Sequence, residues 1–149
     1  MKLVAYFSAS GITREYAKIM SNKLGADLFE IKPEEEYTKK DLNWLNPFSR
    51  STKEMKDEFS RPDFIDKLDN IDKYDEIYVG FPVWWYTCPH IVNTFLEYYN
   101  FNNKYVKVFF TSGSTGEDKI KKSLSNYGFI SRVKRIASME DLNNFIDEN

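Results

Sequence analysis

A short loop rich in hydroxyl side chains follows the first apolar run of the chain. It reads Ser8, Ala9, Ser10, Gly11, Ile12 and Thr13, with no lysine or arginine before Arg14. The run before the loop has the pattern of a strand and the segment after it that of a helix. Backbone N–H groups and the positive end of a helix dipole are therefore expected to face the loop, and its hydroxyls would add neutral donors. The loop predicts a site for a terminal phosphate, and a turn capped by serine or threonine is the alternative.

Three aromatic side chains stand together after a later apolar run. That loop reads Pro82, Val83, Trp84, Trp85, Tyr86 and Thr87. Exposed aromatic rings are unfavourable unless something flat covers them, so the loop predicts a stacking site for a planar heteroaromatic ligand. The alternative is that the rings pack against residues 32–74, and the two interpretations can hold for different rings.

A third loop follows the next apolar run and reads Thr111, Ser112, Gly113 and Ser114. Its glycine and hydroxyl content is typical of a segment that binds the edge of a ligand through backbone groups. A phosphate site, an aromatic slot and a polar edge together describe a phosphorylated, flat cofactor.

The elements that must position these loops follow from five apolar runs. They lie at residues 2–7, 27–31, 76–81, 105–111 and 132–137, and segments with helical spacing separate most of them. Alternating strands and helices predict an α/β fold with a parallel sheet covered by helices on both faces. Charges interrupt the second and fifth runs, which are therefore expected at the sheet edges, and this favours the strand order 2-1-3-4-5. A ligand then binds beyond the carboxyl ends of the strands, between strands one and three.

Residues 32–74 form a connection that is too long for a structureless loop. We expect short helices at 38–45 and 51–59 and interpret the segment as an elaborated crossover inside a single domain of residues 1–149.

Composition excludes several classes of protein. The 149 residues carry 21 Lys and Arg against 23 Asp and Glu, a net charge of -2, so no nucleic-acid surface is indicated. One cysteine and one histidine cannot build a zinc cage, and no metal site is expected. No apolar stretch approaches the length of a membrane span, so we expect a cytoplasmic protein that does not bind a membrane.

The three loops resemble those of the flavodoxin family, in its branch with a long connection after strand two. The resemblance rests on four segments and covers nearly the whole chain; the segments are residues 4–13, 80–87, 93–96 and 111–114, with 46–51 in the crossover as a fifth similarity. It implies a flavodoxin-like three-layer sandwich and flavin mononucleotide (FMN) as the cofactor. By this resemblance Ser8, Ser10, Gly11, Ile12 and Thr13 would hold the phosphate. Residues 82–87 would border the isoalloxazine ring, and residues 111–114 would contact its other edge.

Two functions are compatible with such a site. One is an FMN-binding redox protein that passes electrons through the flavin to a partner protein. The other is an FMN-dependent NAD(P)H:quinone-type reductase that acts on a small acceptor. Electron-carrier flavodoxins often have a glycine in the loop beside the ring, and residues 82–88 contain none. The long crossover could also support a homodimer contact.

Three further residues have two interpretations each. Cys88 precedes Pro89 at an expected helix start, which could make the thiol reactive, although a structural role is favoured. His90 could donate a proton near the flavin, or it could be an inert exposed side chain. Arg50 could close over the pocket, or it could be a solvated charge.

Overall fold

The computed structural model describes residues 1–148 and contains a parallel sheet between two layers of helices. The strand order is β2-β1-β5-β6-β7, and all four neighbouring pairs are parallel. The strands are β1 (Lys2–Tyr6), β2 (Asp27–Glu30), β5 (Glu76–Pro82), β6 (Tyr105–Thr111) and β7 (Ile130–Arg135). This order confirms the prediction from the apolar and charged runs. The last strand begins and ends two residues before its expected bounds.

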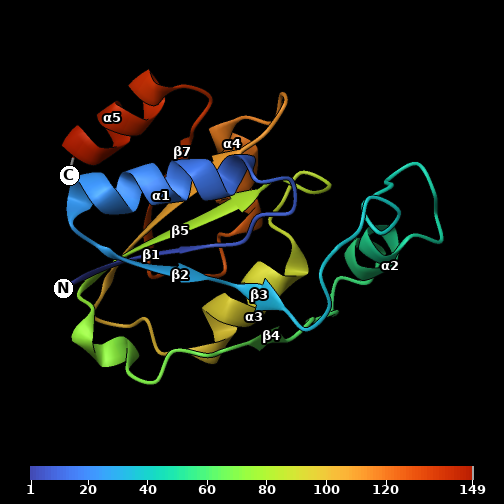
Figure 1. Ribbon diagram of the computed structural model, residues 1–149, viewed down its shortest axis with the longest axis horizontal. Helices are drawn as coiled ribbons and strands as arrows, with labels where there is room; N and C mark the ends of the chain where they lie inside the picture. The colour runs from blue at the N-terminus through green and yellow to red at the C-terminus, as the bar shows by residue number, and fades with distance from the viewer. Residues whose placement is uncertain (149) are drawn as a thin grey trace.

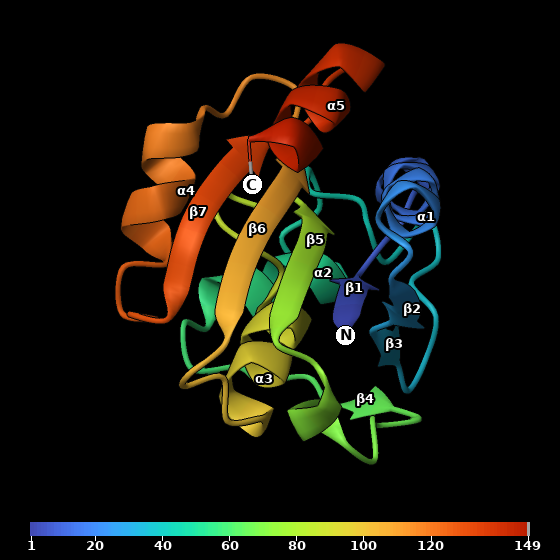
Figure 2. The ribbon, with the colours of Figure 1, turned by 90° about the vertical axis from the view of Figure 1, so that its left-hand side faces the viewer.

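Helices cover both faces of the sheet, as Figures 1 and 2 show. On one face, α1 (Ile12–Leu24) and α5 (Met139–Asp147) bury Met20, Leu142 and Phe145 against the inner strands. On the other, α3 (His90–Tyr98) and α4 (Glu117–Ser123) bury a larger core. No helix within residues 1–148 is long and apolar enough to cross a membrane.

The helix ends follow the chemistry of their capping residues. Gly25 ends α1 in the left-handed region, with φ of 62°, a conformation that glycine adopts without a steric penalty. The Ser138 side chain accepts a hydrogen bond from the Asp141 N–H, while the Asp141 carboxylate accepts one from the Ala137 N–H. These reciprocal bonds fix the start of α5, much as a capping box does.

The crossover differs in part from its predicted structure. A short antiparallel pair, β3 (Lys32–Pro33) with β4 (Phe64–Ile65), and a 3-10 turn at Ile71–Lys73 were not predicted. The helix expected at 38–45 is wrong: the segment forms turns, because the Thr38, Asp41, Asn43 and Asn46 side chains bond nearby backbone N–H groups. The helix expected at 51–59 is α2 (Arg50–Lys56), which ends three residues early at a turn that Asp57 stabilises. Figure 1 shows α2 beyond the carboxyl ends of the strands.

Gly80 in β5 is a point of close approach within the core. A Cβ atom placed there would lie 2.1–2.7 Å from ring atoms of Phe109, the residue of β6 that is paired with Gly80. Gly80→Ala should lower the free energy of unfolding by about 1–3 kcal/mol, because the fully buried ring must move. Urea denaturation measures this change. Gly128→Ala is the control, since nothing lies within 4 Å of a Cβ atom at that position. Equal stabilities of the two variants would contradict the proposed crowding.

Candidate functional site

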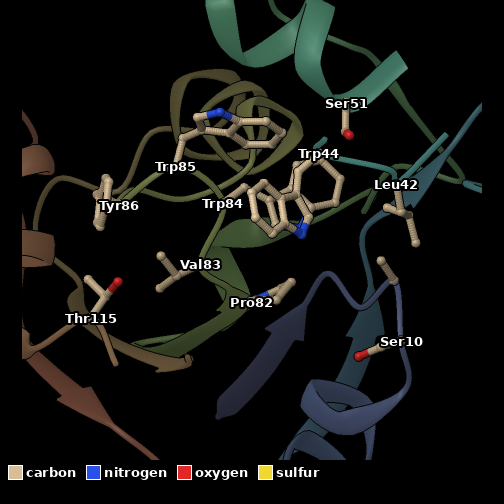
Figure 3. A pocket seen from close by; sticks show the side chains of 11 residues that line it. Ser10, Leu42, Trp44, Ser51, Pro82, Val83, Trp84, Trp85, Tyr86 and Thr115 are labelled. Carbon is tan, nitrogen blue, oxygen red and sulfur yellow. The ribbon is translucent and has the colours of Figure 1, made fainter. Parts of the chain in front are cut away.

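Three loops meet at the carboxyl edge of the sheet, where β1 and β5 are neighbours. The Phe7 N–H donates to the Gly80 carbonyl at 2.9 Å, and the Val83 N–H donates to the Thr111 carbonyl at 2.9 Å. These bonds hold the ends of β1, β5 and β6 beside one another. The first and second loops border a cavity of about 490 Å³, drawn in Figure 3, and Thr115, which directly follows the third loop, also lines it. Its volume lies within the usual range for small-molecule and cofactor sites.

The first loop leaves the start of α1 without a side-chain cap. Gly11 has φ of 96°, and no side chain bonds the helix N-terminus. Nothing lies within 4 Å of a Cβ atom placed on Gly11, so the space beside its backbone is open. The first turn of this 13-residue helix has N–H groups without helical partners, next to Ser10, which lines the cavity.

The side chains of this loop differ in what they can offer a ligand. Ser8 Oγ accepts from the Gly11 N–H at 3.0 Å, and the buried Thr13 hydroxyl bonds the Thr111 hydroxyl at 3.0 Å. Both groups are thus already engaged in holding the loop. Ser10 lines the cavity and is exposed. Arg14 bonds Glu30 at 3.0 Å and Tyr6, an arrangement that raises the pKa of its guanidinium. The groups free to meet a phosphate here are neutral, as expected.

Trp84 packs against the crossover. Its ring meets Phe7 edge to face at 5.5 Å and Tyr37, a crossover residue, at 5.3 Å between centroids. Arg50 lies 3.8 Å above the Tyr37 ring and pairs with Glu54 at 3.3 Å. The Tyr37 hydroxyl also donates to Glu54. Burial, together with this hydrogen bond, raises the pKa of the Tyr37 hydroxyl. For this ring, packing on residues 32–74 is the observed arrangement, although Trp84 still borders the cavity.

Trp85 and Tyr86 form a strained two-residue turn. Their φ values are 47° and 65°, and Trp84 and Thr87 exchange backbone hydrogen bonds of 2.9 and 3.1 Å across them. This is the pattern of a type I′ turn, which favours Asn-Gly and disfavours bulky side chains. The rings are 40% and 62% exposed, and Lys119 lies 4.1 Å from the Tyr86 centroid. The turn keeps both rings available at the cavity mouth.

Arg135 of β7 fixes the third loop. Its guanidinium donates to Ser112 Oγ at 3.1 Å and to the carbonyls of Ser112 and Gly113 at 3.1 and 3.0 Å. Ser112 Oγ donates in turn to the Thr115 carbonyl at 2.8 Å. No sequence pattern indicated this role of Arg135, because its partners are distant in the chain and only the pairing of β6 with β7 brings them together.

The crossover supplies a fourth wall that the sequence analysis did not assign to the site. Leu42, Trp44 and Ser51 line the cavity together with residues of the first and second loops and Thr115. The Ser51 N–H donates to the Asp41 carbonyl at 3.0 Å and so ties the turn containing Leu42 and Trp44 to α2. The similarity of residues 46–51 to the flavodoxin branch was the available signal.

The three residues with two interpretations are all held by the fold. Cys88 is fully buried and bonds Asn93 at 3.3 Å, and burial raises the pKa of its thiol to about 12. The suggestion of a reactive thiol is therefore wrong. His90 is buried and its Nδ1 bonds the Ser60 hydroxyl at 2.6 Å, and burial lowers the pKa of its imidazole. It is not the exposed side chain expected. Arg50 is neither a lid nor a solvated charge, because it joins Tyr37 and Glu54.

Comparisons with known proteins identify the family. Residues 1–140 match the model of a flavodoxin family. A protein of Bacteroides uniformis ATCC 8492 named as a flavoprotein has 41% identity over 98% of this chain and 97% of its own, with a TM-score of 0.89. Another flavoprotein, from Bacteroides eggerthii DSM 20697, has 34% identity over 99% of this chain and 96% of its own, with a TM-score of 0.91. A Lactobacillus acidophilus NCFM flavoprotein in complex with FMN has 23% identity over 99% of this chain and 96% of its own, with a TM-score of 0.74. Among curated proteins none matches the chain.

The chain belongs to the flavodoxin family. The match confirms the resemblance drawn from the three loops, together with the flavodoxin-like sandwich. It also supports FMN, the cofactor of this family, as the ligand against which the site is to be tested.

The strain in the Trp85–Tyr86 turn predicts that a better turn sequence stabilises the flavin-free protein. The double variant Trp85→Asn and Tyr86→Gly should raise the free energy of unfolding by about 1–3 kcal/mol, since asparagine and glycine adopt the left-handed backbone of this turn at a much smaller steric cost. Urea denaturation provides the measurement. Trp85→Phe with Tyr86→Phe is the control and should gain nothing, because bulky side chains remain. An unchanged stability of the Asn-Gly variant would show that the turn is not strained.

Proposed function

We propose that this protein binds FMN at the carboxyl edge of its sheet and transfers electrons through the bound flavin. The proposal is carried by one observation: a single cavity connects an uncapped helix start, which suits a phosphate, with exposed aromatic rings, which suit a flat ring. Family membership and the FMN complex of the Lactobacillus acidophilus protein support it.

The residues present fit FMN in three respects. The open space beside Gly11 leaves room for a phosphate at the amino terminus of α1. None of the residues that line the cavity has a charged side chain, so the wall suits a neutral ring system. The Arg135 bonds to the Ser112 hydroxyl and carbonyl fix the third loop beside Thr115, which lines the cavity.

In this proposal each element has one task. Backbone N–H groups in the first turn of α1 and the Ser10 hydroxyl bind the phosphate. Residues 82–87 border one side of the ring, and residues 111–114 border its opposite edge. FMN, when bound, supplies the capacity to accept and donate electrons, while the protein binds it, orients it and limits its contact with water.

Gly11→Ala tests the phosphate position. The left-handed backbone at Gly11 disfavours alanine, so the first N–H groups of α1 should shift and FMN affinity should fall about tenfold. Gly25→Ala is a matched control at the other end of the same helix, because it too has positive φ and open space. Both variants should lose about 1 kcal/mol of stability. Quenching of flavin emission on titration measures affinity, and equal affinities of the two variants would contradict the placement.

A second candidate function is reduction of a small quinone by NADH or NADPH through the flavin. The aromatic and aliphatic wall formed by Leu42, Trp44 and Trp85 favours it, because a neutral flat acceptor could stack there without meeting a charge.

An activity assay separates the two functions. The FMN-loaded protein is mixed with NADH or NADPH and a quinone, with no other reductase present, and the oxidation of the nicotinamide is followed by absorbance. If the first function holds, turnover should require an added partner reductase. Turnover without one would establish the reductase and would contradict a function limited to electron carriage.

A further inference from the structure

Ser51 carries a buried hydroxyl that the fold leaves without a partner. The residue is 1% exposed, and Ser51 Oγ is the one buried side-chain nitrogen or oxygen within residues 1–148 that makes no hydrogen bond. Folding removes this group from water without a replacement bond, which is unfavourable. An unpaired hydroxyl in such a place indicates a missing partner.

The neighbouring hydroxyls of α2 show that the local backbone does not impose this state. Ser49 and Thr52 are also buried, yet the Ser49 hydroxyl donates to Thr52 Oγ at 2.9 Å and accepts from the Thr52 N–H. Ser51, between them, points in another direction. Figure 3 shows its hydroxyl directed from α2 toward the side of the cavity formed by Trp44.

The cavity at this point is continuous with the phosphate loop. Figure 3 shows Ser10, Leu42 and Ser51 on one side of the cavity, with Trp44 and Trp84 in the middle and Tyr86 and Thr115 on the opposite side. A ligand anchored by its phosphate at the first loop therefore occupies the same cavity that Ser51 lines. The wall around the hydroxyl is aromatic and aliphatic, so the matching chemistry is a neutral ring carrying a carbonyl or a ring N–H group.

Aromatic cover for such a ring also comes from this side. The third loop contains no aromatic residue, and Trp84 already meets Phe7 and Tyr37. Trp44 is 69% exposed although it lines the cavity. Its indole is therefore available to cover a flat ligand.

We propose that the crossover completes the flavin site: Ser51 Oγ forms a hydrogen bond with a polar atom of the isoalloxazine ring, and Trp44 covers the ring beside it. This inference rests on the proposed binding of FMN. It assigns the crossover a direct role in holding the cofactor, in addition to the three loops at the strand ends.

The test compares Ser51→Ala with wild type in two measurements. Flavin affinity, from quenching of flavin emission, should fall about five- to tenfold for both FMN and riboflavin, because the lost bond is to the ring that both share. The melting temperature of the flavin-free variant should stay equal or rise, since an unpaired buried hydroxyl has been removed. Ser51→Cys, which has the same shape with a somewhat larger end atom but is a weak donor, should lose affinity to a similar extent.

The matched control is Ser21→Ala. Ser21 is a buried serine of α1 whose hydroxyl donates to the Lys18 carbonyl at 2.9 Å, and it does not line the cavity. Its removal should lower the melting temperature and leave flavin affinity unchanged, which is the opposite pattern.

Each other outcome overturns the inference. Wild-type affinity in Ser51→Ala, with wild-type protein binding FMN, rejects the Ser51 contact and leaves the proposed function standing. Wild-type affinity in Ser51→Cys alone would show that volume, not hydrogen bonding, matters. A change confined to quinone binding by the FMN-loaded protein would assign the hydroxyl to an acceptor instead. If wild type binds no FMN, the inference and the proposed function both fail.

Discussion

The packing of Trp84 between Phe7 and Tyr37 joins the three parts of the molecule that the site needs. Phe7 follows β1, Trp84 follows β5 and Tyr37 belongs to the crossover, so two edge-to-face contacts connect segments that are distant in the chain. Each such pair contributes about 0.5–1.5 kcal/mol beyond the burial of its area. Arg50 and Glu54 hold Tyr37 in turn. This cluster helps to hold α2 over the carboxyl edge of the sheet, together with the Ser60 hydroxyl, which bonds both Glu54 of α2 and His90 of α3.

Some groups around the cavity are held by hydrogen bonds within the protein, whereas others have a disfavoured backbone conformation or an unpaired hydroxyl. The Thr13–Thr111 bond, the Ser8–Gly11 bond and the bonds from Arg135 fix the backbone of two loops before any ligand arrives. Around the same cavity, Trp85 and Tyr86 occupy the left-handed region and Ser51 lacks a partner. Strain and unpaired polar groups gather at functional sites, because the surrounding structure can stabilise what the local sequence disfavours. The presence of both features at one cavity is consistent with a ligand-binding site.

The arginine side chains near the cavity are all bonded to other groups of the protein. Arg14 pairs with Glu30, Arg50 with Glu54, and Arg135 with the carbonyls of the third loop, so none of these cations lines the cavity. The start of α1 contributes positive potential next to Ser10, and Lys119 lies over Tyr86 at the cavity mouth. A phosphate held in this way by backbone N–H groups and neutral hydroxyls is bound mainly by the geometry of the loop. Small changes in the Gly11 backbone should therefore matter more than changes in nearby charge.

The sequence by itself determined the strand order, the three loops and the family, because these depend on local patterns. Continuous apolar runs mark strands buried on both faces, charged runs mark edges, and Gly25 and Ser138 mark helix ends. It did not determine the crossover, where side chains of Thr38, Asp41 and Asn46 bond nearby backbone and replace a helix by turns. Only the tertiary structure decided which hydroxyls are engaged, that Cys88 and His90 are buried, that Arg135 holds the third loop and that Ser51 lines the cavity. The physical reason is that a hydrogen-bond partner or a cavity wall depends on which distant segments meet in space, and residue type and spacing do not contain that information.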